Sequence, residues 1–261
     1  MDTRSDNVRI SYDDMGQGEP ALLLMPGWCA SRAMFHHIAP KCSAHRRTLA
    51  LDWGGHGQSE APQWDFGAST LVAEALSVIE ASGLQQIVPV TNAHSGWIAI
   101  ELRRQLAERI PKIVLLDWII LEPPAPFLTG LKALQDPQRW QQARNQLFST
   151  WLTGVDNSEV IHFVHDVMGA HGFEMWSRSG REIGNAYAQS GSPLQKLETL
   201  KPQVPVLHLY TQPDDLEYLA AQQSFADTHP WFKVQKIAAH SHFPMIEVPD
   251  QIALAIEQFV S

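Results

Sequence analysis

The chain has little cysteine, little positive charge and no long hydrophobic run, and each shortage argues against a class of protein. Only Cys29 and Cys42 occur among the 261 residues, which fits neither a disulfide framework nor a Cys-x-x-Cys metal or redox site. The formal net charge is −9 and there is no run of Lys or Arg, so we expect no nucleic-acid or acidic-membrane partner. No apolar stretch approaches membrane-spanning length.

The rest of the composition is that of a globular protein. Hydrophobic residues make up 44% of the chain and charged residues 18%, which is enough apolar material for a sizeable core. The N-terminal stretch MDTRSDNVRI is polar and lacks the apolar centre of a secretory signal. We therefore expect a cytoplasmic protein without a transmembrane segment. Nine tryptophans are many for this length, and an aromatic-lined pocket is a reasonable use for some of them.

Short apolar runs alternate with helical patterns along the first part of the chain. The runs predict strands within VRISYDDMGQGEP, ALLLMPGW, RRTLALDW, QQIVPV and KIVLLDW. Helical periodicity appears in STLVAEALSVIEASG, which stops at Gly83, and in HSGWIAIELRRQLAERI. Strands that alternate with helices predict an α/β fold, with a mostly parallel sheet flanked by helices on both faces.

The pattern changes to helices alone between residues 122 and 199, and the strand pattern returns at PVPVLHLYTQ and VQKIAAHSHF before a closing helix. We therefore predict one α/β domain, formed by residues 1–121 and 200–261, and a helical cap formed by residues 122–199. Such an insertion usually covers the C-terminal ends of the strands, where ligands bind in open α/β sheets.

The stretch PVTNAHSGW passes from a buried strand directly into a helix, where the α/β-hydrolase fold holds its nucleophile. This sharp turn, the elbow, requires small residues two positions before and two positions after the nucleophile. If Ser95 is the nucleophile, the flanking residues are Ala93 and the bulky Trp97. If Ala93 occupies the position, the flanking residues are Thr91 and Ser95, which are both small. We favour the second register, in which the elbow has no nucleophile and serine acyl transfer is impossible there.

A base and an acid that orients it are expected nearby. The loop after the last strand, AAHSHFP, offers His240 and His242, and we favour His242 because it precedes the tight turn into the final helix. The acid is either Asp117, at the end of the strand KIVLLD, or Asp214 or Asp215, after the strand VPVLHLY. Fold logic alone does not separate these candidates.

Two backbone amides complete the expected site. Gly27 permits a turn after the strand LLLMPG, so that the Trp28 amide and the His94 amide can donate to a developing negative charge. Both amides remain when the nucleophile is lost. A base, its orienting acid and an oxyanion pocket suit proton abstraction from an acidic hydroxyl group.

These motifs resemble the cofactor-independent 2,4-dioxygenases that cleave the ring of 3-hydroxy-4(1H)-quinolones. The resemblance covers nearly the whole chain, including the cap, and its matching stretches include GWC at 27–29, GGHGQS at 54–59, HSGW at 94–97, LLDW at 115–118, DPQRW at 136–140, FSTWL at 148–152, WSRSGREI at 176–183 and HFPMIEVPD at 242–250. It implies that Asp117 and His242 form the catalytic pair and that Trp28 and His94 form the oxyanion pocket.

The resemblance also implies that Trp151 lies near the substrate, and we expect Ala93 and Ser95 to border it. The family usually has a serine at the elbow, so Ala93 puts substrate affinity or preference in doubt more than the reaction. The implied reaction consumes O2, needs no metal or organic cofactor, and releases carbon monoxide and an N-acylanthranilate. The C2 substituent of the substrate (hydrogen, methyl or long alkyl), the oligomeric state and the roles of Trp176 and His240 stay open.

Two other functions remain as alternatives. One is a serine hydrolase of esters or amides that uses Ser95 with His242 and Asp117 or Asp214. The other is a protein of the same fold that binds a small aromatic ligand without catalysis, which Ala93 would suit but an intact base would not.

Overall fold

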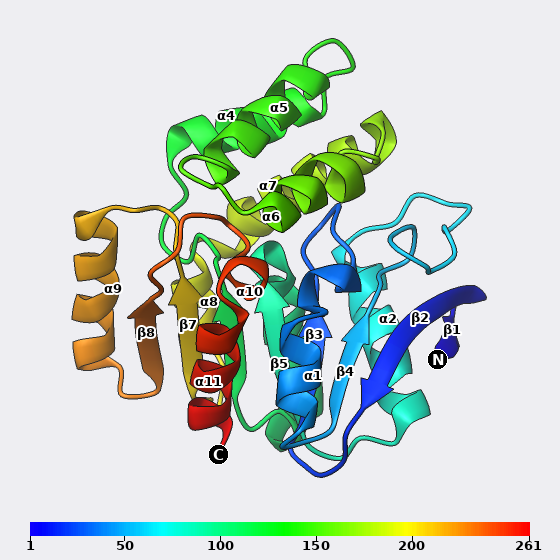
Figure 1. The fold of residues 1–261 in the computed structure, drawn as a ribbon, viewed down its shortest axis with the longest axis vertical. Coiled ribbons are helices and arrows are strands. Elements are labelled where there is room, and N and C mark those ends of the chain that lie inside the picture. Colours follow the sequence, from blue (N-terminus) through cyan, green and yellow to red (C-terminus); the bar gives the residue numbers. More distant parts are fainter.

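Eight strands form one sheet in the computed structural model, which describes residues 1–261, and their order is β1-β2-β4-β3-β5-β6-β7-β8 (Figure 1). β1 (Asp2–Ser5) pairs antiparallel with β2 (Val8–Met15), which pairs antiparallel with β4 (Thr48–Leu51). All other pairings are parallel, and they join β4, β3 (Ala21–Met25), β5 (Ile87–Asn92), β6 (Ile113–Leu116), β7 (Val206–Tyr210) and β8 (Phe232–Lys236). The predicted mostly parallel sheet is confirmed.

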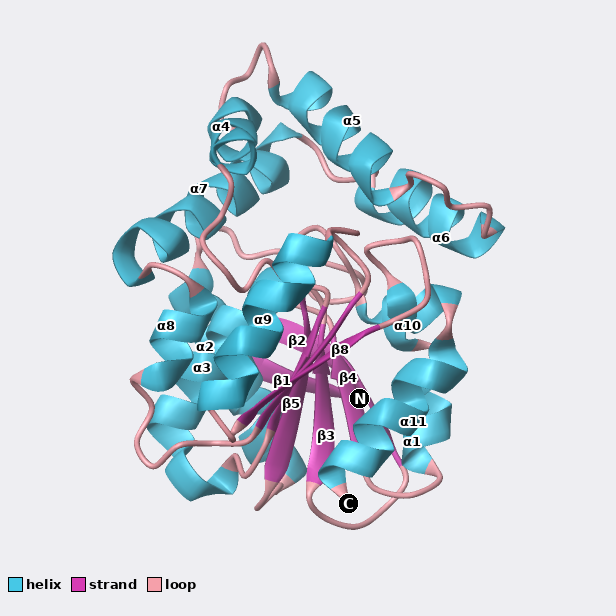
Figure 2. Cartoon of the chain, turned by 90° about the vertical axis from the view of Figure 1, so that its left-hand side faces the viewer, coloured by secondary structure: helices cyan, strands magenta, loops and turns pink.

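Helices cover both faces of this sheet, as Figure 2 shows along the sheet edge. One face carries α1 (Ile38–Ser43) and α11 (Pro249–Val260), and the other carries α2 (Ala68–Ser82), α3 (Gly96–Leu106), α8 (Pro193–Glu198) and α9 (Leu216–Thr228). Every residue of β3, β5, β6 and β7 is buried. Strands buried on both faces need continuous apolar runs, which is why the sequence pattern located them.

Where the observed strands and helices differ from the predicted ones, the causes are local. The sequence does not predict β1, because its four residues, DTRS, contain no apolar run. A hairpin to β2 forms this strand, and its turn residues Asp6 and Asn7 have φ of 47° and 68°. β5 extends to Asn92, and α3 begins only at Gly96, because the three residues between them form a 3-10 turn, η2 (Ala93–Ser95). α2 ends at Ser82 and is capped by Gly83, the predicted stop, which has φ of 67°.

Helices alone connect β6 to β7. α4 (Ala125–Leu134), α5 (Trp140–Trp151), α6 (Ser158–His162), the π-helix η4 (Phe163–Met168) and α7 (Phe173–Ser190) lie over the C-terminal ends of the strands (Figure 1). Short helices in the connecting loops are η1 (Arg32–Phe35), η3 (Ala107–Arg109) and α10 (Pro244–Glu247). No helix has both the length and the apolar character that a membrane crossing requires.

Candidate active site

A cavity of about 820 Å³ lies between the C-terminal ends of the strands and the helices above them. Its floor consists of residues from the loops after β3, β5, β6 and β8, namely Gly27, Trp28, Ala93, His94, Asp117 and His242. The helices above contribute Leu131, Leu134, Leu147, Trp151, Met168, Trp176 and Ile183. Every residue that the sequence analysis placed at the site lines this cavity, except Ser95.

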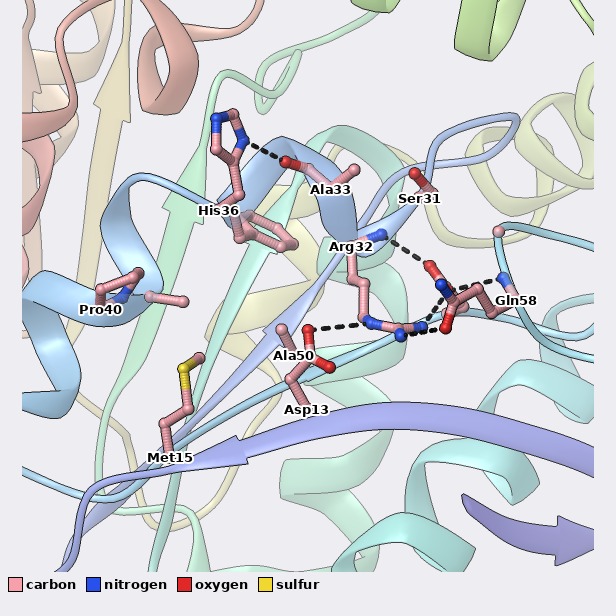
Figure 3. Close-up of a pocket in the computed structure, with 13 residues that line it drawn as sticks. Asp13, Met15, Ser31, Arg32, Ala33, His36, Pro40, Ala50 and Gln58 are labelled. Carbon is pink, nitrogen blue, oxygen red and sulfur yellow. Dashed lines mark hydrogen bonds and ion pairs between the residues drawn. The ribbon is translucent and has the colours of Figure 1, made fainter. Parts of the chain in front are cut away.

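A second cavity, of about 680 Å³, surrounds Arg32 on the outer side of the loop after β3 (Figure 3). The Arg32 guanidinium forms ion pairs with Asp13 and Asp52 and donates to the side-chain oxygen of Gln58 at 2.8 Å. Its charge is therefore neutralised within the chain, and none of the predicted site residues lies in this cavity.

His242 and Asp117 form a hydrogen-bonded pair at the floor of the larger cavity. His242 Nδ1 lies 3.1 Å from Asp117 Oδ1, and the two side chains are 15% and 2% exposed. A carboxylate only accepts, so Nδ1 carries the proton and Nε2 has a free lone pair. The arrangement orients the imidazole so that Nε2 is the nitrogen left to accept a proton from a ligand in the cavity.

The structure brings neither alternative acid to His242. Asp214 is exposed and pairs with Lys236, whereas Asp215 accepts from the Glu217 amide at 2.8 Å and so caps α9. Asp117 has φ of 47° at the end of β6, which is the backbone turn that aims its carboxylate at the loop after β8. Its second oxygen, Oδ2, accepts from the Thr211 backbone N–H at 2.9 Å and lies within hydrogen-bonding distance of the Thr211 hydroxyl.

Trp151 covers the imidazole of His242 from α5. The two rings are stacked, with centroids 5.1 Å apart and an interplanar angle of 13°. Phe243 packs edge-on against Trp151 at 5.7 Å. Because the indole lies flat against the imidazole, Trp151 restricts rotation of the His242 ring and excludes water from one side of it.

The elbow has alanine at its strained position. Ala93 has φ of 50°, a left-handed conformation that costs an L-residue about 1–2 kcal/mol, and it lines the cavity. Cys29, in the loop after β3, has φ of 61°, so strained residues occur in both loops that border the floor. Such strain persists only where the surrounding structure imposes it, and it concentrates at functional sites.

Ser95 lies away from the cavity, which corrects the expectation that it borders the ligand. Its side chain is buried, with the residue 3% exposed, and its hydroxyl donates to the Pro26 carbonyl. Ser95 does not line the cavity, and its hydroxyl is bonded to Pro26 and not to His242. This position argues against the hydrolase alternative based on Ser95.

The loops that carry Trp28 and His94 approach each other closely. A Cβ on Gly27 would lie 3.1 Å from Asn92 Oδ1 and 3.6 Å from the Ala93 Cβ, so a larger residue would need the Asn92 side chain to shift. The backbone N–H of Trp28 has no acceptor among the loop hydrogen bonds, and that of His94 lies in the first turn of η2, where helical N–H groups have no acceptor within the helix. Two free amides beside the same cavity are the geometry of an oxyanion pocket.

The His94 side chain adds a neutral donor to the site. The indole N–H of Trp118 donates to His94 Nδ1 at 3.1 Å, so the proton of His94 is on Nε2. Burial, followed by repulsion from His242, lowers the pKa of His94 to about 3. His94 is therefore uncharged near neutral pH, and Phe127 stacks on its ring at 5.7 Å.

Sequence reasoning missed three residues that support this site. Thr211 holds the carboxylate of the pair, Trp118 fixes the tautomer of His94, and His56 accepts the Cys29 amide. Trp118 was part of a noted Asp-Trp motif, and His56 was part of a glycine-rich loop that we treated as generic to the fold. Thr211 had no signal of its own, because its partner lies 94 residues away in the sequence.

The two residues whose roles stayed open differ in position. Trp176 is 2% exposed and lines the cavity, and its indole N–H has no hydrogen-bond partner in the chain. His240 is exposed at the rim, where its backbone N–H donates to Glu247 at 2.9 Å. The group of metal-ligating side chains that converges in this structure, His36, His37 and Glu159, lies outside the cavity.

Known proteins match this chain over its full length. A family model described as alpha/beta hydrolase fold matches residues 20–160. A 2-heptyl-3-hydroxy-4(1H)-quinolone dioxygenase of Mycobacteroides abscessus is 35% identical over 250 residues, which cover 95% of this chain and 93% of the relative. A 1H-3-hydroxy-4-oxoquinoline 2,4-dioxygenase of Pseudomonas putida is 33% identical over 253 residues, 96% of each chain.

A solved structure agrees with these relatives. An AqdC variant in complex with its substrate, from work on recognition and ring cleavage of the Pseudomonas quinolone signal, superposes with a TM-score of 0.95 at 32% identity and covers 100% of this chain and 98% of the other. The α/β-hydrolase fold predicted from the sequence is thereby confirmed. From its sequence and its fold, this chain belongs to the family of 3-hydroxy-4-quinolone dioxygenases.

Proposed function

We propose that this chain is a cofactor-independent dioxygenase that uses O2 to cleave the heteroaromatic ring of a 2-alkyl-3-hydroxy-4(1H)-quinolone. The observation that carries the proposal is the complete His242–Asp117 pair beside an elbow that holds Ala93. A base without a nucleophile suits proton abstraction and cannot form an acyl-enzyme. A protein that only binds its ligand has no need of such a base.

The first step in the proposed reaction is removal of the 3-hydroxyl proton. His242 Nε2 accepts this proton, and the Asp117 carboxylate stabilises the imidazolium that forms. The amides of Trp28 and His94, together with the Nε2–H of His94, hold the oxygens on which negative charge develops. All of these donors are fixed before the substrate arrives, so they need no reorganisation during the reaction.

The electron-rich anion then reacts with O2 directly. A bond forms between oxygen and C2, and the resulting peroxide attacks the C4 carbonyl carbon. The C2–C3, C3–C4 and O–O bonds break, C3 leaves with its oxygen as carbon monoxide, and both atoms of O2 remain in the N-acylanthranilate. The chain contributes the base and the oxyanion donors to this sequence, and the substrate anion supplies the electrons.

The apolar side of the cavity favours an alkyl group at C2. Leu131, Leu134, Leu147, Met168 and Ile183 line the part of the cavity formed by the cap helices. The relative from Mycobacteroides abscessus is named for a 2-heptyl substrate. Because each buried methylene contributes about 0.8 kcal/mol, KM is expected to fall by up to about fourfold for each carbon that the cavity accommodates.

The test is oxygen uptake and carbon monoxide release by the purified protein with a metal chelator present. The substrates are 3-hydroxy-4(1H)-quinolones with hydrogen, methyl and heptyl at C2. We expect turnover of at least one of them, with the heptyl compound preferred, and a loss of about 10²–10⁴-fold in His242→Ala.

The matched control is His45→Ala, which changes an exposed histidine far from the cavity and is expected to keep full activity. Ligand binding without oxygen uptake for all three compounds would support the non-catalytic binder instead. Release of N-acylanthranilate without carbon monoxide would contradict the proposed order of bond breaking.

A further inference from the structure

Two histidines and a glutamate meet where the helices above the cavity contact the sheet domain. His36 follows η1, His37 precedes α1, and Glu159 lies in the first turn of α6. His36 Nε2 is 2.6 Å from one carboxylate oxygen of Glu159, and His37 Nε2 is 2.8 Å from the other. The three ligand atoms of the group all lie within 4.8 Å of one another.

The proton positions at His36 follow from its second nitrogen. His36 Nδ1 lies 2.6 Å from the Ala33 carbonyl oxygen, as Figure 3 shows. A carbonyl oxygen only accepts, so Nδ1 carries a proton, and Nε2 presents a lone pair to Glu159 unless a positive group lies between them. The bond to Ala33 orients the ring so that His36 Nε2 is the ligand atom that faces Glu159.

The neighbouring imidazole favours a shared cation. The rings of His36 and His37 have centroids 3.8 Å apart. His36 Nε2 and His37 Nε2 face the two oxygens of the same carboxylate, so three ligand groups converge in one small region. One divalent ion between the three side chains satisfies both nitrogens and the carboxylate together.

We propose that His36, His37 and Glu159 bind one divalent transition-metal ion, with Zn²⁺ as the best fit. Two imidazole nitrogens and one carboxylate, with a fourth position for water, are a common ligand set for Zn²⁺. A hydrogen bond from the second imidazole nitrogen to a carbonyl, as His36 makes to Ala33, is the usual support for such a ligand.

The spacing of the ligands requires only a small movement. Tetrahedral Zn²⁺ places its ligand atoms about 3.3 Å apart, so the contacts of 2.6 Å and 2.8 Å open by about 0.7 Å and about 0.5 Å. The three side chains are 47%, 39% and 41% exposed and are free to adjust. The backbone of Glu159 is held by Asn157, whose side chain accepts from the Glu159 amide at 2.9 Å.

The expected consequence is a metal link between two parts of the chain that are 122 residues apart. The link joins α6 to the start of α1 outside the active-site cavity. It therefore stabilises the closed arrangement of α6 on the sheet domain and takes no part in the reaction at His242. This site stands independently of the proposed dioxygenase activity.

The first test is calorimetric titration of chelator-treated, metal-free protein with ZnCl2 at pH 7.5. We expect saturable binding of one equivalent, and at least a tenfold loss of affinity in Glu159→Gln and in His37→Gln. His162→Gln is the matched control, because His162 is an exposed histidine on the same helix whose partner is Asp166. Zn²⁺ should raise the melting temperature of the wild type and of the control, but not of the two variants.

A second measurement uses Co²⁺ as a spectroscopic probe. The visible absorption of the Co²⁺-loaded protein should appear in the wild type and in His162→Gln, and should be lost in Glu159→Gln. Binding should weaken between pH 7.5 and pH 6 as protons compete for the imidazoles. Absence of saturable binding, or unchanged binding in both folded variants, would overturn the proposal and leave a protonated ion pair in its place.

Discussion

The backbone N–H of Cys29 donates a hydrogen bond of 3.1 Å to Nε2 of His56. His56 Nδ1 donates in turn to the Gly54 carbonyl at 3.0 Å, so this ring joins the loop after β4 to the loop that carries Trp28. Burial, followed by repulsion from His171, lowers the pKa of His56 to about 3. The imidazole therefore stays neutral and keeps accepting the amide of Cys29, whose φ of 61° it helps to hold.

Removal of this acceptor should misplace the Trp28 amide. We predict that His56→Leu lowers kcat at least tenfold with little change in KM, because an oxyanion donor acts mainly in the transition state. His56→Gln retains an acceptor and should recover part of the loss. Steady-state kinetics of oxygen uptake measure both effects. His171→Gln changes a neighbouring ring at 5.1 Å and serves as the control, and full activity in a folded His56→Leu would refute the prediction.

Thr211 should affect kcat through its hydrogen bonds to Asp117. Replacing its hydroxyl in Thr211→Val leaves the backbone N–H bond to Asp117 but removes the side-chain one. A hydrogen bond to a charged group contributes about 1.5–3 kcal/mol, so we expect kcat to fall about tenfold or more while Thr211→Ser stays near the wild type. The measurement is the initial rate of oxygen uptake at several substrate concentrations, from which kcat is obtained. The exposed Thr228→Val is the control. Equal rates in the valine and serine variants would show that the hydroxyl has no such role.

The elbow predicts a contrast in reactivity toward a fluorophosphonate probe. Wild-type protein should not be labelled, because Ser95 is buried and bonded to Pro26. Ala93→Ser places a hydroxyl at the strained turn beside His242 and the two free amides, which is the arrangement that activates a serine, and it should be labelled. Mass spectrometry of the labelled peptide identifies the site. Labelling of Ser95 in the wild type would restore the hydrolase alternative.

Titration of the buried Glu74 side chain should make the free energy of unfolding depend on pH. Its side chain is fully buried, one oxygen accepts from the Gly54 amide at 3.0 Å and the other has no partner. Burial raises the pKa of Glu74 from its ordinary value of 4.5 to about 7. The folded chain thus binds this proton more tightly than the unfolded chain, so the stabilisation is complete below about pH 4.5 and is lost as pH rises through about 7.

The corresponding variant is Glu74→Gln, which does not titrate. Relative to this variant, the wild type should lose on the order of 3 kcal/mol of unfolding free energy between pH 4.5 and pH 8. Denaturant unfolding at several pH values measures the difference. Glu80→Gln changes an exposed residue on the same helix and should keep the wild-type pH dependence. The same slope in Glu74→Gln and the wild type would mean that another group is responsible.

Local sterics and periodicity account for what the sequence by itself determined. Continuous apolar runs identified the buried parallel strands, because each such strand needs apolar side chains on both faces. The requirement for small residues around the elbow selected Ala93 over Ser95, since that rule involves only neighbours along the chain. The resemblance to known dioxygenases, carried by motifs such as LLDW and HFP, then pointed to Asp117 and His242.

Only the tertiary structure decided which distant groups meet. His242 and Asp117 are 125 residues apart, and periodicity could not choose Asp117 over Asp214 and Asp215, because all three follow strands that end at the same edge of the sheet. The bond from Cys29 to His56 and the approach of Glu159 to His36 likewise depend on how loops pack after the sheet has formed. Local patterns record the burial of each segment, whereas the contacts between segments arise from their packing in three dimensions.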